Sequence, residues 1–222
     1  MEKPRFPLRA IFWSGTPEEN FLGHIFSEIY KEQIYEPYLI GKKDLTIVEV
    51  GAHVGIASLY FSQYAKQVYA VEPSAEHFFA LSTMLDFNRV RNVKPIKKAI
   101  YIEKKVLPFY HNRNKTMYSL HQAVEDNSQP TEGVEAISLA DLFEEEKIEH
   151  ADLLKLDVEG SEIEILSGKA FREIAPKIEL IIGESHGWSG RNPNQLREAL
   201  RKAGFSFEII PAQANIFVAK KK

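Results

Sequence analysis

Short apolar runs alternate with amphipathic segments through most of the chain. Residues 46–50, 67–71 and 93–96 are short runs rich in β-branched side chains, which favours strands. The third run contains a proline, which places it at the edge of a sheet or at a strand start. Residues 56–64 carry apolar side chains at helical spacing, and residues 74–88 begin with a serine that can cap a helix. Strands that are apolar throughout and alternate with helices predict a parallel α/β sheet covered on both faces.

The second half of the chain continues this order of strands and helices. Residues 152–157 and 178–183 are predicted strands, and a short capped helix that begins after Ser138 precedes the first of them. Between these two strands we predict another helix, with a capping box formed by Ser161 and Glu164. The chain therefore contains several strand–helix–strand crossovers of the kind that build one continuous sheet.

The last predicted elements are one helix and two strands. The helix opens at Asn192, before a proline, and Gly204 closes it. Residues 205–210 and 215–219 are predicted strands, joined only by residues 211–214. A parallel crossover needs a dozen or more residues, so this pair must form an antiparallel hairpin. One terminal strand of an otherwise parallel sheet is thus predicted to run against the rest.

Two segments differ from this repeating pattern. Thr16 and Pro17 are typical of a helix start, and apolar positions at helical spacing follow, so we interpret residues 1–40 as a helical appendage to a main domain of residues 41–222. Residues 111–133 are polar, without clear periodicity, and longer than an ordinary connection. They are a candidate lid or substrate insertion, whose polar residues at the acceptor side include His111, Asn112, Arg113, Asn114, Lys115 and His121.

Composition limits the classes of function. The chain has 222 residues, a net charge of −3, 44% hydrophobic residues and no cysteine. It therefore has no disulfide, thiolate metal site or cysteine nucleophile, and the acidic balance disfavours a nucleic-acid partner. No apolar run is long enough to span a bilayer, and the first residues lack the apolar region of an export signal. We expect a cytoplasmic protein with no membrane partner; the oligomeric state stays open.

A glycine-containing turn, residues 49–55, lies where the first predicted strand passes into the first helix. Gly51 and Gly55 let the backbone come close to a ligand at the helix N-terminus. The position that a dinucleotide motif fills with a second glycine is His53, whose side chain would take the space of a pyrophosphate. A nicotinamide-dependent oxidoreductase is therefore a disfavoured alternative.

An acidic residue at the end of the second strand points to a nucleoside. Glu72 stands 21 positions after Gly51, near the roughly 20-residue offset at which a carboxylate accepts the hydroxyls of a ribose. Glu49 is placed to pair with a cationic amine and would repel a pyrophosphate. S-adenosylmethionine combines adenosine, an ammonium group and a sulfonium, so we predict it as the cofactor. The predicted binding residues are Glu49, Gly51, Ala52, His53, Gly55, Glu72, Pro73, Ser74, Ala99 and Asp157, with Lys98 and Ile100 also bordering the adenine.

Charged side chains gather at two further strand ends, and the predicted catalytic residues among them are Lys155, Asp157, Glu184 and His186. Ligands of open α/β sheets bind at the carboxyl ends of the strands, where all of these side chains would meet. His186 is the preferred general base because an ordinary imidazole titrates near pH 6.5, and Lys155 is the second choice if burial lowers its pKa. Two alternatives stay open: a structural ion pair of Lys155 with Asp157, and a magnesium-like ion held by Asp157, Glu159 and Glu184.

Five segments together resemble the FkbM family of S-adenosylmethionine-dependent methyltransferases. In this order they read VEVGAHVGIASLYF, VYAVEPSAEHF, ISLADLF, LLKLDVEGSEIEILSG and ELIIGESHG, and they lie between residues 46 and 186. The resemblance implies the Rossmann-like class I methyltransferase fold, with a seven-stranded, mostly parallel sheet and an antiparallel C-terminal hairpin. It also implies O-methylation of a hydroxyl on a sugar, polyketide or other small-molecule or glycan-like acceptor. His53 departs from the family pattern, which has a smaller polar residue there. A non-catalytic adenosyl-binding module remains a second alternative.

Overall fold

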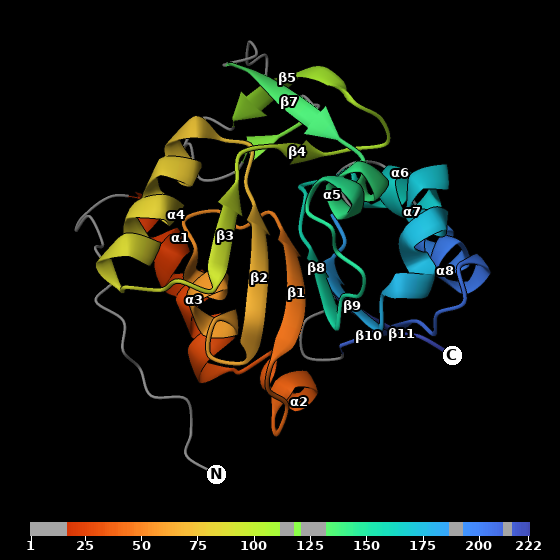
Figure 1. The fold of residues 1–222 in the computed structure, drawn as a ribbon, viewed down its shortest axis with the longest axis horizontal. Coiled ribbons are helices and arrows are strands. Elements are labelled where there is room, and N and C mark those ends of the chain that lie inside the picture. Colours follow the sequence, from red (N-terminus) through yellow and green to blue (C-terminus); the bar gives the residue numbers. More distant parts are fainter. Residues whose placement is uncertain (1–16, 112–117, 121–131, 187–192, 211–214) are drawn as a thin grey trace.

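The main sheet has seven strands in the order β10-β11-β9-β8-β1-β2-β3 (Figure 1). The computed structural model describes residues 17–111, 118–120, 132–186, 193–210 and 215–222. β11 runs antiparallel to its neighbours β9 and β10, and the other pairings are parallel. This confirms the predicted sheet and its C-terminal hairpin. The strands are β1 (Leu45–Val50), β2 (Ala65–Val71), β3 (Val93–Ile96), β8 (Leu153–Leu156), β9 (Leu180–Glu184), β10 (Glu208–Ile209) and β11 (Ile216–Lys220).

Helices cover both faces of this sheet. One face carries α5 (Leu139–Glu145), α6 (Glu162–Ser167), α7 (Lys169–Ile174), η2 (Ala175–Lys177) and α8 (Pro193–Lys202). The other carries α1 (Pro17–Phe26), η1 (Ser27–Lys31), α2 (Glu36–Leu39), α3 (Ile56–Phe61) and α4 (Ala75–Phe87). Val48 packs in the first cluster and Ile47 in the second, because successive side chains of a strand point to opposite faces. The carboxyl ends of the central strands thus lie between two helical layers.

Most of the local sequence signals are confirmed. Ser74 caps α4, since its Oγ accepts a hydrogen bond of 3.2 Å from the backbone N–H of His77. Pro95 lies in β3, the edge strand. The predicted capping box of Ser161 and Glu164 is wrong, because the side chain of Ser161 makes no cap hydrogen bond to α6.

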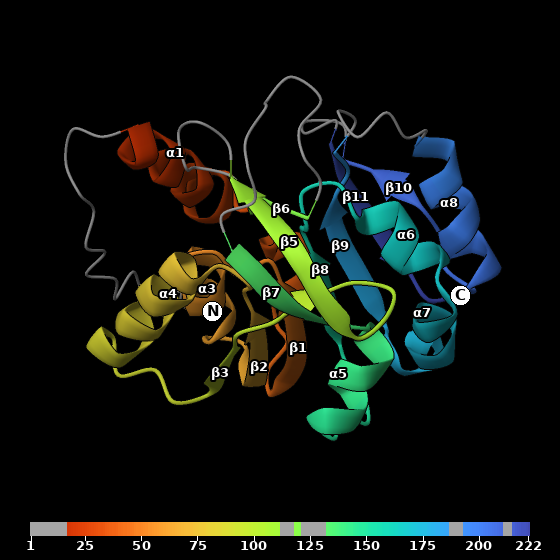
Figure 2. The same cartoon turned by 90° about the horizontal axis from the view of Figure 1, so that it is seen from above.

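A smaller sheet that the sequence analysis missed lies above the carboxyl ends of the main strands (Figures 1 and 2). Its strands, in the order β4-β7-β5-β6, are β4 (Ala99–Ile100), β5 (Lys105–His111), β6 (Tyr118–Ser119) and β7 (Glu132–Ile137). Several residues of the segment 111–133 therefore belong to strands. Residues 112–117 and 121–131 lie outside the described residues, and they include Asn112, Arg113, Asn114, Lys115 and His121. The lid role of this segment stays a prediction.

The described part of the first forty residues packs on the main sheet. Ile29 in η1, Tyr35 and Leu39 are buried in the same cluster as α3 and α4. The described part of the predicted helix starts at Pro17, while Thr16 lies outside the described residues. Gln33 lies beyond η1 with a φ of 58°. The domain boundary at residue 40 stays a prediction.

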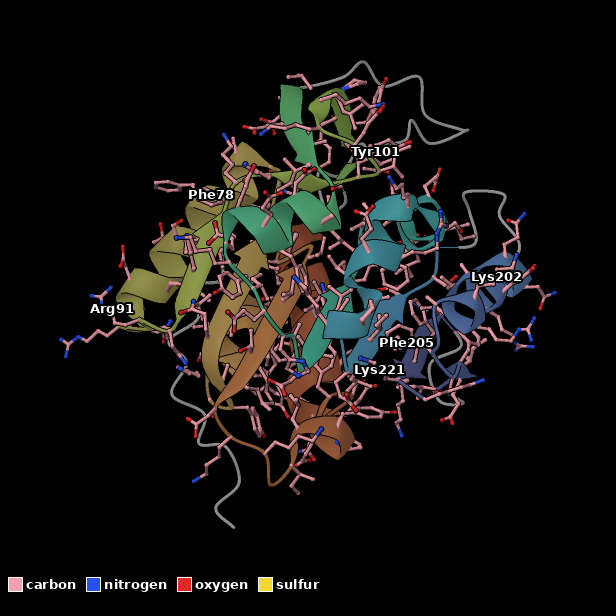
Figure 3. The ribbon with its side chains drawn as sticks, turned by 45° about the vertical axis from the view of Figure 1, so that its right-hand side comes forward. Phe78, Arg91, Tyr101, Lys202, Phe205 and Lys221 are labelled. Atoms are coloured by element: carbon pink, nitrogen blue, oxygen red, sulfur yellow. The ribbon has the colours of Figure 1, made fainter. Side chains whose placement is uncertain are left out.

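Charged side chains mark opposite ends of the molecule. Figure 3 shows Arg91 and Lys202 projecting on opposite sides, whereas Phe205 is buried and stacks on Phe171, with ring centroids 6.2 Å apart. Of the helices within the described residues, none has the length and apolar character needed to cross a lipid bilayer.

Candidate functional site

The site lies where β1 and β8 end side by side, at the point where the order of the sheet reverses. Asp157 donates its backbone N–H to the carbonyl of Val50 at 3.1 Å. Gly51, which follows β1, has a φ of +79°, and a Cβ added to it would lie 1.8 Å from the carbonyl oxygen of Asp157. A Cβ on Gly55 would similarly meet Leu81. Contact with the backbone of Asp157 therefore requires a glycine at position 51, and a φ of +91° favours one at position 55, independently of any ligand.

Two cavities open at this edge and share Ile25, Gly51, His53, Asp157 and Glu159. The larger has a volume of about 370 Å³ and the smaller about 90 Å³. The polar residues of the larger cavity include Glu28, Glu49, Lys155, Asp157, Glu159, Glu184 and His186. The residues of the smaller cavity include Val71, Glu72, Pro73, His77, Lys98, Ala99, Ile100, Phe109 and Leu120. Because five residues line both, the two cavities form adjoining parts of one site.

Glu72 lines the smaller cavity and organises the loop that follows β2. Its Oε1 accepts a hydrogen bond from the backbone N–H of Ser74, and its Oε2 accepts one from that of His53, each at 2.9 Å. Burial raises the pKa of Glu72 to about 7, although both of these hydrogen bonds oppose the shift. The carboxyl group predicted to bind a ribose is therefore fixed in place by the backbone beside the cavity.

A pair of histidines forms the wall next to Glu72. The rings of His53 and His77 meet edge to face, with centroids 3.9 Å apart. Burial lowers the pKa of His77 to about 4 and that of His53 well below its ordinary range, so both rings are neutral at pH 7. His53 also has a φ of 52°, which orients its backbone N–H toward Glu72. The histidine that departs from the family pattern is thus part of the cavity wall.

Some of the residues predicted to border the adenine line the smaller cavity, and others do not. Pro73, Lys98, Ala99 and Ile100 line the smaller cavity, whereas Ser74 lines neither cavity because its hydroxyl caps α4. Gly55 also lies away from both cavities and packs on Leu81. The lining residues that were missed include Phe109 in β5 and Leu120 after β6. The strands that carry them were not predicted, so the sequence analysis had no reason to place them here.

Glu49 lies deep in the larger cavity, opposite Lys155 in the register of β1 and β8. Its side chain is fully buried, and the hydroxyl of Ser58 donates to Oε2 at 2.6 Å. Among the described residues no hydrogen-bond partner reaches Oε1. Burial raises the pKa of Glu49 to about 7. The cavity therefore presents an unsatisfied buried carboxyl oxygen, the group predicted to pair with an amine.

Lys155 connects the glycine turn to Asp157. Its Nζ donates to the carbonyl of Gly51 at 2.6 Å and to Oδ2 of Asp157 at 3.1 Å, so the ion pair left open by the sequence is present. Burial alone lowers the pKa of Lys155, but the nearby Asp157, Tyr35 and Glu49 outweigh it and raise the pKa above its usual value. The lowered pKa on which a role as general base depends is therefore absent.

His186 is surrounded by carboxylates. Its Nδ1 lies 2.6 Å from Oε1 of Glu162, and its Nε2 lies 3.2 Å from Glu159, 3.8 Å from Asp157 and 3.8 Å from Glu184. Burial lowers the pKa of His186, yet these carboxylates raise it overall, to about 9. The expectation of an ordinary imidazole was wrong, because His186 is protonated at pH 7. Glu162 was missed as its partner, since the sequence assigned this segment to helix capping.

The N-terminal helices also contribute to the larger cavity. His24, Ile25, Glu28 and Ile29 line it from α1 and η1. The apolar stripe at helical spacing predicted that this segment packs on the body of the protein. Glu28 is a polar residue next to these apolar positions, and nothing in the pattern predicted that it lines the cavity.

The fold is similar to that of Rossmann-like methyltransferases of known structure. The chain resembles a precorrin-6y C5,15-methyltransferase from Geobacter metallireducens, with a TM-score of 0.52, 12% identity and coverage of 86% of this chain and 87% of that one. A SAM-dependent methyltransferase from Aquifex aeolicus gives a TM-score of 0.51 at 13% identity, covering 90% and 95%. A putative methyltransferase from Streptococcus mutans in complex with SAH gives 0.50 at 11% identity, covering 85% and 94%. At these identities the likeness concerns the fold alone.

The sequence places the chain within this class. The methyltransferase FkbM domain matches residues 49–207, and the chain belongs to this family. It is also 26% identical over 234 residues to the methyltransferase sdnD of Sordaria araneosa, which covers 89% of each chain. The family predicted from the five sequence segments is confirmed.

Proposed function

We propose that this FkbM-family protein transfers a methyl group from S-adenosylmethionine to a hydroxyl oxygen of a sugar or other small-molecule or glycan-like acceptor. The observation that best supports the proposal is the pair of adjoining cavities at the ends of β1, β2 and β8. Glu72 lies at one end and Glu49 at the other, with Gly51 and Asp157 between them. A ligand with a ribose at one end and an ammonium group at the other matches this order of carboxyl groups.

The residues present fit this cofactor. The unsatisfied Oε1 of Glu49 is an acceptor for an ammonium group in a buried place, where an unpaired polar atom is costly. Each oxygen of Glu72 has accepted one backbone hydrogen bond and can accept another from a ribose hydroxyl. Ala99 and Phe109 supply apolar walls for a purine ring. The complex of the Streptococcus mutans protein with SAH supports the same use of the fold.

Methyl transfer asks the protein mainly for positioning. When bound, the cofactor supplies a methyl carbon activated by a sulfonium. The larger cavity would hold the acceptor hydroxyl beside the cofactor, and one of its carboxylates would accept the hydroxyl proton. Asp157, which lines both cavities, is placed between the two partners, and Lys155 holds it there. Glu184 and His186 complete the acceptor side as proposed catalytic residues, and in the metal-free protein His186 is a cation between the carboxylates around it.

Calorimetry with S-adenosylmethionine and its demethylated product tests the cofactor. We expect binding by the wild type and a loss of about 10–150-fold in Glu72→Ala and Glu49→Gln, since each removes a hydrogen bond to a charged group worth about 1.5–3 kcal/mol. Glu173→Gln, on the exposed side of α7, is the matched control and should bind as the wild type does. A folded wild type that binds neither ligand would contradict the proposal.

Product analysis tests the reaction. Incubation with methyl-labelled cofactor and a panel of sugar and phenolic hydroxyls should give an O-methylated product by mass spectrometry. Binding without product from any hydroxyl acceptor would favour the non-catalytic adenosyl-binding module instead.

A further inference from the structure

We propose that the larger cavity binds a divalent cation through Asp157, Glu159 and His186. The binding site stands on its own geometry. Its use, to hold the acceptor hydroxyl and favour its deprotonation, rests on the proposed function.

The three side chains are arranged around one point. One ligand atom from each lies within 4.8 Å of the other two. The Nε2 of His186 is 3.2 Å from Oε2 of Glu159 and 3.8 Å from Oδ1 of Asp157, and Glu184 offers a fourth oxygen at 3.8 Å. Neighbouring ligands of an ion bound at about 2.1 Å lie about 3 Å apart, so small side-chain movements bring these atoms into one coordination shell.

His186 is held in the orientation of a metal ligand. Its Nδ1 lies 2.6 Å from Oε1 of Glu162, which also accepts the backbone N–H of Gly160 at 3.1 Å. Metal-bound histidines commonly donate their other ring N–H to a carboxylate in this way. If the ring carries a hydrogen on Nδ1 alone, the lone pair of Nε2 points at the carboxylates of Asp157, Glu159 and Glu184. A lone pair and three carboxylates repel one another, so a proton or another cation must lie between them. A divalent ion can take the place of that proton.

Carboxyl groups outnumber basic side chains in the larger cavity. The carboxyl of Glu49 is fully buried, lines the same cavity and has no hydrogen-bond partner at Oε1 among the described residues. The Oε2 of Glu159 is also buried, and the nearest cation to it is the ring of His186, whose Nε2 lies 3.2 Å away. Lys155 is the only lysine or arginine among the described residues that line the cavity, and it is engaged by Gly51 and Asp157. Buried carboxylates in such excess favour a cation from solution.

The donor set points to a particular kind of ion. Carboxylate oxygens suit magnesium, calcium and manganese, whereas an imidazole suits first-row transition metals. Mn²⁺ accepts both kinds of ligand, so it is the appropriate probe, with Mg²⁺ as its competitor.

The test is a titration of the chelator-treated full chain with Mn²⁺, following the free ion by electron paramagnetic resonance in the absence of cofactor. We expect one ion per chain and a loss of at least about tenfold in affinity in Glu159→Gln and Asp157→Asn. Glu162→Ala should weaken binding by about 10–100-fold, as loss of a partner to a metal-bound histidine does, and Glu162→Gln, whose amide oxygen still accepts the N–H, should weaken it less.

Two controls separate a built site from general attraction. Glu28→Gln removes a charge from the same cavity but from η1, outside the cluster, and Glu173→Gln removes one from the far face. Glu173→Gln should bind Mn²⁺ as the wild type does, and Glu28→Gln should lose less affinity than Glu159→Gln. An equal loss in Glu28→Gln and Glu159→Gln would overturn the proposal, and so would a folded wild type whose dissociation constant exceeds about 1 mM.

Thermal unfolding shows whether the variants fold. Glu159→Gln relieves like-charge repulsion, so it should be folded without metal, and Mn²⁺ should raise the melting temperature of the wild type but not of this variant. Failure of this shift in the wild type would count against the metal site. Binding of S-adenosylmethionine is measured separately, in the presence of chelator. A protein that binds this cofactor but not Mn²⁺ overturns only the metal site. A protein that binds Mn²⁺ but not the cofactor overturns only the proposed function.

Discussion

Glu72 shows how one carboxyl group can serve both the fold and the site. Burial raises its pKa from 4.5 in the unfolded chain to about 7 in the folded protein, even with two backbone N–H groups bonded to it. Between these pH values the folded chain holds a proton that the unfolded chain has released. The free energy of unfolding therefore falls as pH rises through this window, and the contribution is fully present only below pH 4.5.

Glu72→Gln should remove that part of the pH dependence. We expect the difference in unfolding free energy between pH 4.5 and 7 to be smaller in the variant than in the wild type, as measured by urea unfolding at several pH values. Glu76→Gln, an exposed position in the first turn of α4, should keep the slope of the wild type. Identical slopes in Glu72→Gln and the wild type would show that this carboxyl does not carry the shift.

The sequence could predict which residues meet at the site more readily than what they do there. Gly51 and Glu72 are 21 positions apart in a strand–turn–helix pattern, which is a local signal. The charge of His186 depends on Glu162, which lies 24 positions away and on a different element. No sequence pattern reports such a contact, so the histidine was expected to have an ordinary pKa.

Whole elements also differ in whether local sequence or distant contacts define them. The cap of α4 and the start of α5 follow from hydrogen bonds between near neighbours in the chain, and both were predicted. β4 has two residues and β6 also two, too short for a period to be recognised. β5 pairs with β7 across an intervening segment of about twenty residues, so neither strand is defined by its own sequence alone. The second sheet is therefore a product of tertiary pairing.

The capping box of α5 gives an element-level prediction. The hydroxyl of Ser138 accepts the backbone N–H of Asp141 at 3.1 Å, and the Asp141 carboxylate accepts the N–H of Ser138 at 2.9 Å. Ser138→Ala should cost about 1–2 kcal/mol of unfolding free energy in a urea titration. Ser167→Ala, at the exposed last residue of α6, should change it by less than about 0.5 kcal/mol. Equal effects would mean that this box adds nothing to stability.

At the scale of the molecule, the N-terminal helices contribute buried side chains to the hydrophobic core. Ile29 is 3% exposed within the cluster that contains α3 and α4, while Ile40 is 55% exposed. Glu28, next to Ile29, faces the larger cavity. The packing that stabilises this segment thus also closes one side of the site.

Substituting the two isoleucines measures that connection. Ile29→Ala should lower the unfolding free energy by about 2–5 kcal/mol, since it leaves a cavity in a packed core, and Ile40→Ala should change it by less than about 0.5 kcal/mol. Both values come from urea unfolding. A small effect of Ile29→Ala would support the interpretation of residues 1–40 as a separable appendage.

The order of the sheet also decides how the site is divided along the chain. Glu49, Gly51 and Glu72 come before residue 112, whereas Asp157 and His186 come after residue 131. A chain cut between these two halves would have an incomplete site in each fragment. Recovery of ligand binding on mixing would require β1 to pair with β8 and β5 with β7 again. The protein could therefore serve as a split reporter, in which ligand binding shows that the two fragments have reassembled.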